Sequence, residues 1–200
     1  MRIQFEPSDF KAAIATSVVL YGFDGENLKI LIATKSGPPF AGADIIPSSV
    51  VHPNEDPGQV AKELMLRVTG YDHWPIEILN AFADPYRNPD GRVVNVAYYA
   101  TLRLDREIEY ELKRSEYRWV NADDVPPLAF DHNQIVEYSK ERLKRRVKRR
   151  PIGFSMLPKE FTLNQIQRLY ECALGKNLDK RNFRRKLLRS QLLIDTGKVI

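Results

Sequence analysis

Residues 151–188 read PIGFSMLPKEFTLNQIQRLYECALGKNLDKRNFRRKLL, and this stretch predicts two short amphipathic helices joined by a turn. The first helix is expected to begin after Thr162, because a glutamine stands three residues further on, as in a capping box. Its apolar stripe has helical spacing and consists of Leu163, Ile166, Leu169 and Tyr170. Gly175 is suited to end this helix, because glycine readily adopts the left-handed conformation of a C-terminal cap.

The second helix is expected to follow the cap Asp179 and to present a basic face. Phe183, Leu187 and Leu188 are predicted to face inward. The outward cations are Lys180, Arg181, Arg184, Arg185 and Arg189. A basic helix after a short turn is typical of a helix-turn-helix, whose second helix enters the major groove of DNA.

Such a helix reads bases through arginine contacts to guanine and asparagine contacts to adenine, while the remaining cations meet phosphates. The first helix would direct its N-terminus, which favours anions, at a phosphate. The candidate DNA-binding residues are therefore Thr162, Asn164, Lys180, Arg181, Asn182, Arg184, Arg185 and Lys186.

The charge of the whole chain is divided unevenly along the sequence. Residues 141–200 hold 17 Lys and Arg and 5 Asp and Glu, a net +12, whereas residues 1–140 hold 14 and 21, a net −7. A basic block can be merely a solvated surface, but this one is interleaved with apolar residues at helical spacing and has few acids to pair with. An RNA-binding or simple metabolite-binding module ranks lower, because the clustered aromatics of single-strand recognition are missing.

Composition excludes several other classes of protein. Cys172 is the single cysteine, which rules out an internal disulfide framework and a thiolate metal cluster. His52, His73 and His132 lack metal-ligand spacing and are assigned no role, so we expect neither a metal nor a cofactor. No stretch approaches the roughly 20 apolar residues of a membrane span, and we expect a cytoplasmic protein without a membrane partner.

The N-terminal part reads as a mixture of strands and helices, so the fold class is α+β. Expected strands span residues 13–23 and 28–33, joined as a hairpin, then 76–83, 92–104 and 117–120, while residues 36–47 read as a loop. Expected helices are residues 57–68, capped by Gly70, and a charged helix that ends before Pro151, with Ile135, Ser139, Leu143 and Val147 on one side. We predict a boundary near residues 149–153 and two domains, 1–150 and 151–200.

Residues 46–71, IPSSVVHPNEDPGQVAKELMLRVTGY, resemble the Nudix hydrolase signature in their strand, loop and helix frame. Aligning on Glu55 and Gly70 puts Ser49 at the family's glycine and Glu63 at its arginine. The family's three helix glutamates, which hold divalent metal, fall on Leu64, Arg67 and Val68. A cation and two hydrocarbons cannot replace oxygen ligands, so we expect no catalytic residues and no phosphoanhydride hydrolysis.

The alternative is a Nudix-type phosphohydrolase that acts on ADP-ribose or a nucleotide sugar with non-standard metal ligands. Glu55 and Glu63 are the carboxylates left within the motif for such an enzyme.

The stretch 151–188 resembles the C-terminal winged helix-turn-helix of the Nudix-related transcriptional regulators of the NrtR and AraR type. Upstream, GRVVNVAYYATL (91–102) and YRWVNADDVPPLAFDH (117–132) are similar to the sensor domain of the same family. The resemblance implies a Nudix-like α/β/α sandwich followed by a winged helix-turn-helix. It further implies a homodimer that binds an operator in double-stranded DNA and responds to a sugar or an ADP-ribose-like effector. The sequence stops just after Gly197 and Lys198, where a wing would be expected, so the wing is either minimal or missing from this chain.

By analogy with the hydrolases, the effector should lie between the sheet and the loops at residues 49–55 and 84–92. The candidate ligand-binding residues are Glu55, Asp84, Tyr86, Arg87 and Arg92. Arg87 would pair with a phosphate or a sugar hydroxyl and Asp84 would accept from sugar hydroxyls, although both residues could instead pin a turn through local hydrogen bonds.

Overall fold

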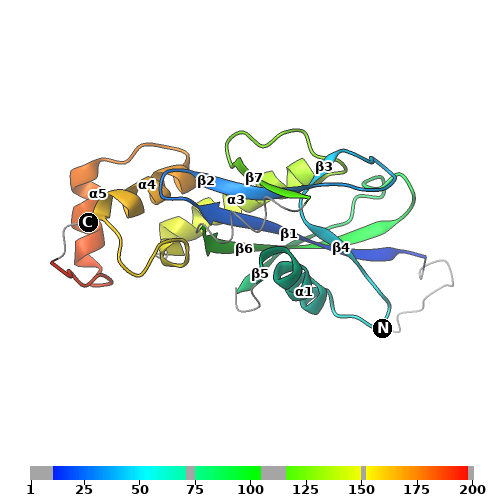
Figure 1. The fold of residues 1–200 in the computed structure, drawn as a ribbon, viewed down its shortest axis with the longest axis horizontal. Coiled ribbons are helices and arrows are strands. Elements are labelled where there is room, and N and C mark those ends of the chain that lie inside the picture. The colour runs from blue at the N-terminus through cyan, green and yellow to red at the C-terminus, as the bar shows by residue number, and fades with distance from the viewer. Residues whose placement is uncertain (1–10, 71–74, 105–115, 150–151, 198–200) are drawn as a thin grey trace, which may run out of the picture.

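The computed structural model describes residues 11–70, 75–104, 116–149 and 152–197. These residues form a mixed seven-stranded sheet covered by helices, with a pair of helices at one end of the molecule (Figure 1). The strands are β1 (Ala13–Phe23), β2 (Leu28–Thr34), β3 (Asp44–Ile45), β4 (Ser48–Val51), β5 (Ile76–Phe82), β6 (Val93–Arg103) and β7 (Tyr117–Asn121). The expected α+β class is confirmed.

Strands β1 and β6 form the centre of the sheet and run parallel from the pair Ala13 and Val93 to the pair Phe23 and Arg103. The β1–β2 hairpin is antiparallel, as predicted. Its turn is held by the Asp24 carboxylate, which accepts from the backbone N–H groups of Glu26 and Asn27 at 2.9 and 2.7 Å. The remaining pairs around β2, β4 and β5 are antiparallel.

Alternate residues of β1 face two different helices, because successive side chains of a strand point to opposite faces of the sheet. Val19, Tyr21 and Phe23 join the core beneath α3 (His132–Arg149). Val18 and Leu20 join the core beneath α1 (Pro57–Thr69). The two helices therefore cover opposite faces, which is the expected α/β/α sandwich.

Helix α1 has the ends that the sequence predicted. The Asp56 side chain accepts from the Gln59 N–H at 2.9 Å, Pro57 stands in the first turn, and Gly70 has φ of 75°. On the other face, the predicted stripe of α3 is buried. Its Ser139 hydroxyl lies 2.6 Å from the Tyr21 hydroxyl and also donates to the Val136 carbonyl.

The expected loop at residues 36–47 contains one element that the sequence did not indicate. Asp44 and Ile45 form the short strand β3 by pairing with Thr34 and Ala33 of β2. Gly37, Pro38, Pro39 and Gly42 favour a loop locally, but the exposed edge of β2 offers backbone partners. Tertiary context thus overrides the local preference, as it often does for strands.

The C-terminal part comprises the short 3-10 helix η2 (Ile152–Met156), α4 (Leu163–Leu174) and α5 (Lys180–Arg189). Met156, Ile166 and Leu169 belong to the same buried cluster as β1 and α3. Helix α4 also contacts the β1–β2 turn, because Arg168 Nε donates to the Glu26 carbonyl at 2.9 Å. Residues 150 and 151 lie outside the described residues, so the division into domains 1–150 and 151–200 stays a prediction.

The structure bears on two further expectations, one about the wing after α5 and one about membrane spans. Residues 190–197, the part described after α5, contain no helix and no strand, and so no strand of a wing is seen within them. Among the helices that the structure describes, none combines the length and the apolar character that crossing a membrane would require.

Candidate nucleic-acid interface and ligand cavity

Helices α4 and α5 form a capped helix-turn-helix. The Thr162 hydroxyl accepts from the Gln165 N–H at 3.1 Å and the Gln165 side chain accepts from the Thr162 N–H at 2.8 Å, which confirms the capping box. Gly175 ends α4 with φ of 64°, and Asp179 caps α5 by accepting from the Asn182 N–H. The Thr162 hydroxyl is therefore engaged in its own cap, whereas Asn164 is exposed at this end of α4.

The turn between the helices is held rigidly from inside. The Glu171 carboxylate accepts from the Leu178 N–H at 2.9 Å and from the Gln167 side chain at 3.1 Å. The rings of Tyr170 and Phe183 pack 5.2 Å apart across the two helices. This rigidity sets the direction of α5 relative to α4.

Most of the basic face of α5 is turned to solvent, as predicted, with Lys180, Arg181, Asn182, Arg185, Lys186 and Arg189 all exposed. Arg184, which was also predicted to face outward, is half-buried instead. The prediction that Leu188 faces inward was wrong, since this side chain is 57% exposed. A helix turns by 100° per residue, so with Leu187 buried against α4 and Phe183 beside it, Leu188 lies past the edge of the contact.

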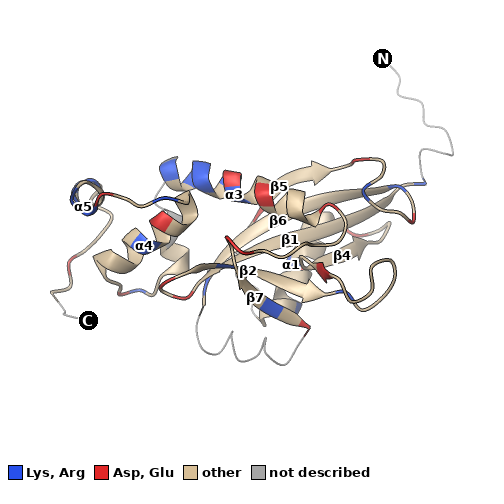
Figure 2. Cartoon of the chain, turned by 90° about the horizontal axis from the view of Figure 1, so that it is seen from above, with Lys and Arg blue, Asp and Glu red and all other residues tan. Residues whose placement is uncertain are grey.

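Two polar pairs organise the basic face. Arg184 is half-buried and donates to the Asn164 side chain at 2.8 Å, which joins the start of α4 to the middle of α5. Arg185 donates to the Asn182 side chain at 2.7 Å. Figure 2 shows the blue cations of α5 at one end of the molecule and a further basic stretch along α3. The arrangement can meet a polyanion with side chains that are already oriented.

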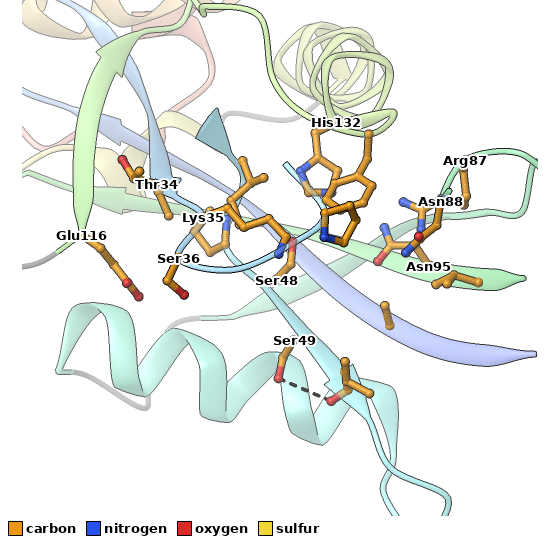
Figure 3. A pocket seen from close by; sticks show the side chains of 18 of the residues that line it. Thr34, Lys35, Ser36, Ser48, Ser49, Arg87, Asn88, Asn95, Glu116 and His132 are labelled. Carbon is orange, nitrogen blue, oxygen red and sulfur yellow. Dashed lines mark hydrogen bonds between the residues drawn. The ribbon is translucent and has the colours of Figure 1, made fainter. Parts of the chain in front are cut away.

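A cavity of about 400 Å³ lies at the opposite end of the sheet, where β1, β2, β4 and β6 meet the segment before α3. Figure 3 shows polar side chains from separate elements that line it. They are Thr34, Lys35, Ser36, Ser48, Ser49, Arg87, Asn88, Asn95, Glu116 and His132. Phe130 and Tyr117 add aromatic surface. Its size and mixed lining are those of a small-molecule site.

Of the five predicted ligand-binding residues, Arg87 alone is in this lining. Its guanidinium is buried and forms a bidentate pair with Asp131, with Nε and Nη2 donating over 2.9 and 2.6 Å. The other four lie outside the lining, in exposed loops with local hydrogen bonds. Glu55 accepts from the His52 N–H, Asp84 accepts from the Tyr86 N–H, Tyr86 is 91% exposed, and Arg92 donates to the Ala83 carbonyl.

His132, to which the sequence assigned no role, is a buried member of the cavity wall. Its Nδ1 accepts from the Ile46 N–H at 3.2 Å, so the ring is neutral, with its proton on Nε2. The pKa of His132 is lowered to about 4, mainly by burial; the nearby Asp131 carboxylate raises it and the Arg87 guanidinium lowers it by smaller amounts. No local signal in the sequence distinguishes this histidine from His52 or from His73, which lies outside the described residues.

The Nudix-like helix does not offer metal ligands where the hydrolase pattern has them. Leu64 and Val68 are 1% and 6% exposed and pack into the core between α1 and the sheet. Arg67 is exposed, and Glu63 accepts from the Gln59 side chain at 3.0 Å on the outer side of the helix. Within the part of the chain that the structure describes, no three His, Cys, Asp or Glu residues gather as a metal site.

Known proteins resemble both parts of this arrangement. The family described as the NrtR DNA-binding winged helix domain matches residues 153–200. The "ADPR responsive transcriptional repressor NtrR" of Acinetobacter baylyi is 28% identical over 201 residues, which cover 98% of this chain and 80% of that protein. The crystal structure of Shewanella oneidensis NrtR superposes with a TM-score of 0.82 at 29% identity, covering 92% of this chain and 88% of the other. The chain is therefore similar to Nudix-related regulators of the NrtR type along nearly its whole length.

The Shewanella protein has also been solved with ligands. Its complex with a 27mer DNA matches this chain with a TM-score of 0.79 at 29% identity, over 92% of this chain and 86% of that one. Its Nudix domain complexed with ADP ribose matches with a TM-score of 0.58 at 25% identity, over 70% of this chain and 94% of that one. The expected fold, a Nudix-like domain followed by a winged helix domain, is thereby confirmed.

The buried His132 makes the free energy of unfolding of this chain depend on pH. Its pKa is about 6.5 when unfolded and about 4 when folded, so the unfolded chain binds the extra proton between these values. The contribution of His132 to the free energy of unfolding is therefore fully present above pH 6.5. It decreases by about 3 kcal/mol as the pH falls from 6.5 to 4. We expect urea unfolding from pH 7 to pH 4.5 to show this slope.

The matched variant is His132→Asn, whose side-chain oxygen can accept from the Ile46 N–H without titrating. We expect this variant to show a weaker dependence of the free energy of unfolding on pH between pH 6.5 and pH 4.5. Equal slopes for the variant and the wild type would show that other groups cause the loss of stability.

Proposed function

We propose that this chain is a transcriptional repressor that binds an operator in double-stranded DNA through α5 and changes its affinity when a metabolite enters the Nudix-like part. The observation that carries the proposal is the exposed basic face of α5 on a rigid, capped helix-turn-helix that matches the NrtR winged helix domain. Arg181 and Arg185 lie one helical turn apart and would read guanines in the major groove. Lys180 and Lys186 would meet phosphates, and Asn182 would read adenine.

The effector that we propose is ADP-ribose or a closely similar nucleotide sugar, bound in the 400 Å³ cavity. Support comes from the ADPR-responsive repressor of Acinetobacter baylyi and from the ADP ribose complex of the Shewanella Nudix domain. The cavity carries matching chemistry: Lys35 for a phosphate, Asn95 and Ser48 for hydroxyls, and Phe130 or Tyr117 as surface for a base. A free sugar, as in the AraR type, is the alternative effector for the test below.

We further propose that the bound effector is not hydrolysed. The positions that hold metal in the hydrolases carry Leu64 and Val68, which point into packed core and have no donor atoms. Arg67 at the third position would repel Mg²⁺. Magnesium-dependent turnover of ADP-ribose that Glu55→Gln abolishes would contradict this part of the proposal.

Regulation requires two global states that the effector distinguishes. We propose a homodimer whose two α5 helices meet successive major grooves of an operator with two-fold symmetry. Effector binding would change their spacing, with a coupling of about 1 to 3 kcal/mol, or roughly 5- to 150-fold in affinity. The contact of Arg168 with Glu26 ties α4 to the sheet and offers one route for this change.

The test is the binding of the full chain to a labelled fragment of its own upstream DNA, followed by fluorescence anisotropy with an excess of random DNA. We expect tight, competitor-resistant binding that weakens steeply with salt, and a shift of at least fivefold when ADP-ribose is added. Titration with L-arabinose in place of ADP-ribose separates the two effector classes. Binding no stronger than that to random DNA would refute the repressor.

A further inference from the structure

The second half of α3 carries cations of two kinds. Four of them have acidic or phenolic partners: Lys140 pairs with Glu137 at 2.7 Å, Lys144 pairs with Glu141 at 2.9 Å, Arg146 contacts Glu77 and the Tyr99 hydroxyl, and Arg142 also interacts with Tyr99. Arg145 and Lys148 differ, since both are exposed and neither has a hydrogen bond or ion pair with any residue that the structure describes. They lie three residues apart, on the same face of the helix.

This face of α3 lies next to α5. Lys148 lines a hollow of about 420 Å³ together with Asn182 and Lys186 of α5. Figure 2 shows the basic stretch of α3 on the same half of the molecule as the cations of α5. The exposed positive surface therefore continues from α5 onto a helix that belongs to the N-terminal part of the chain.

The neighbourhood contains few acids to neutralise these cations. Asp179 uses its carboxylate to cap α5. Glu141 is paired with Lys144, and Arg145 and Lys148 also attract this one carboxylate without forming an ion pair with it. Like charges that outnumber the acids around them raise the energy of the free protein, and a polyanion relieves this repulsion. Lysine and arginine side chains on an exposed helix are long and separately hydrated, which suits phosphate oxygens more than base edges.

We propose that Arg145 and Lys148 of α3 form a second DNA contact. Their side chains bind backbone phosphates next to the major groove that α5 enters. The proposal rests on the proposed function, because it needs an operator bound at α5. Its consequence is that DNA touches both parts of the chain at once, so binding DNA fixes the position of α5 relative to the sensor sheet. An effector that moves one part relative to the other would then have to break phosphate contacts.

The experiment compares the wild type with Arg145→Ala/Lys148→Ala in operator binding from 50 to 300 mM salt, with random DNA measured in parallel. Each phosphate contact contributes about 0.9 to the slope of log affinity against log salt, so we expect the slope to fall by about 2 for each bound protomer. Affinity for operator and random DNA should fall by a similar factor, roughly tenfold at the low-salt end, with their ratio unchanged.

The control is Lys11→Ala/Lys62→Ala, which removes the same net charge from exposed positions before β1 and on α1. We expect it to leave the salt slope within experimental error of the wild type. An unchanged slope in the α3 variant, with selective operator binding intact, would overturn the α3 contact and leave the repressor standing. A wild type without operator selectivity would instead remove the proposed function itself.

Discussion

Replacing Arg181 and Arg185 by alanine is expected to lower the affinity for the operator by about 30-fold or more and to erase its advantage over random DNA. Both side chains are exposed on the outer face of α5, and Arg185 is already oriented by its hydrogen bond to Asn182. Each bidentate contact with guanine is worth about 1 to 3 kcal/mol of discrimination, and the two contacts together about 2 to 6 kcal/mol. Competition anisotropy against random DNA measures both quantities.

The matched control is Arg181→Lys/Arg185→Lys, which keeps both charges but loses the planar fork. We expect it to retain binding to random DNA and its salt slope while losing selectivity. Alanine and lysine both favour helix, so neither variant should unfold α5. Selectivity that survives the lysine substitutions would mean that α5 supplies charge only and that the bases are read elsewhere.

Breaking the buried pair of Arg87 and Asp131 is expected to give the largest loss of stability in the Nudix-like part. Their side chains are 4% and 10% exposed and form two parallel hydrogen bonds between the β5–β6 loop and the start of α3. Removing one partner leaves an uncompensated buried charge, which costs about 3 to 5 kcal/mol. We therefore expect Asp131→Ala to lower the free energy of unfolding in urea by this amount, and to loosen the cavity wall at Arg87 and His132.

The control for this prediction is the double variant Arg87→Met/Asp131→Leu, which replaces both charges by apolar groups of similar size. We expect it to recover most of the lost stability, because replacing a whole buried pair is often neutral or stabilising. If the single and double variants lose the same stability, the pair contributes through packing and its charges are immaterial. Titration of the folded double variant with ADP-ribose is a separate measurement, which reports whether the Arg87 side chain contacts the effector.

Many local features could be predicted from the sequence because each depends on residues close together in the chain. The helix caps at Thr162 and Asp179 involve side chains three residues from the N–H groups that they satisfy. The left-handed ends at Gly70 and Gly175 need only the missing Cβ of glycine. The core-facing stripe of α3 follows from a period of 3.6 residues, and its members are buried as expected. Leu64 and Val68 likewise show in the sequence that the metal ligands of the Nudix pattern are absent.

The wall of the cavity, by contrast, depends on contacts between residues far apart in the sequence. Arg87 meets Asp131 across 44 residues, and His132 accepts from Ile46 across 86. An arginine in a turn-rich loop is equally typical of a ligand contact and of a structural cation, so the sequence indicates Arg87 for the site but contains no sign of its partner Asp131. The parallel pairing of β1 with β6 and the added strand β3 arise in the same way, from partners that no local pattern names.

Local periodicity and capping chemistry therefore determined which segments are helices and strands, which faces are apolar, and where the basic helix begins. Only the tertiary structure decided which buried charges are paired, that His132 is neutral and part of the cavity, and that the cations of α3 lie beside those of α5. The physical reason is range: backbone geometry couples residues within about one helical turn, whereas burial and charge pairing depend on whichever segments the packed core brings together.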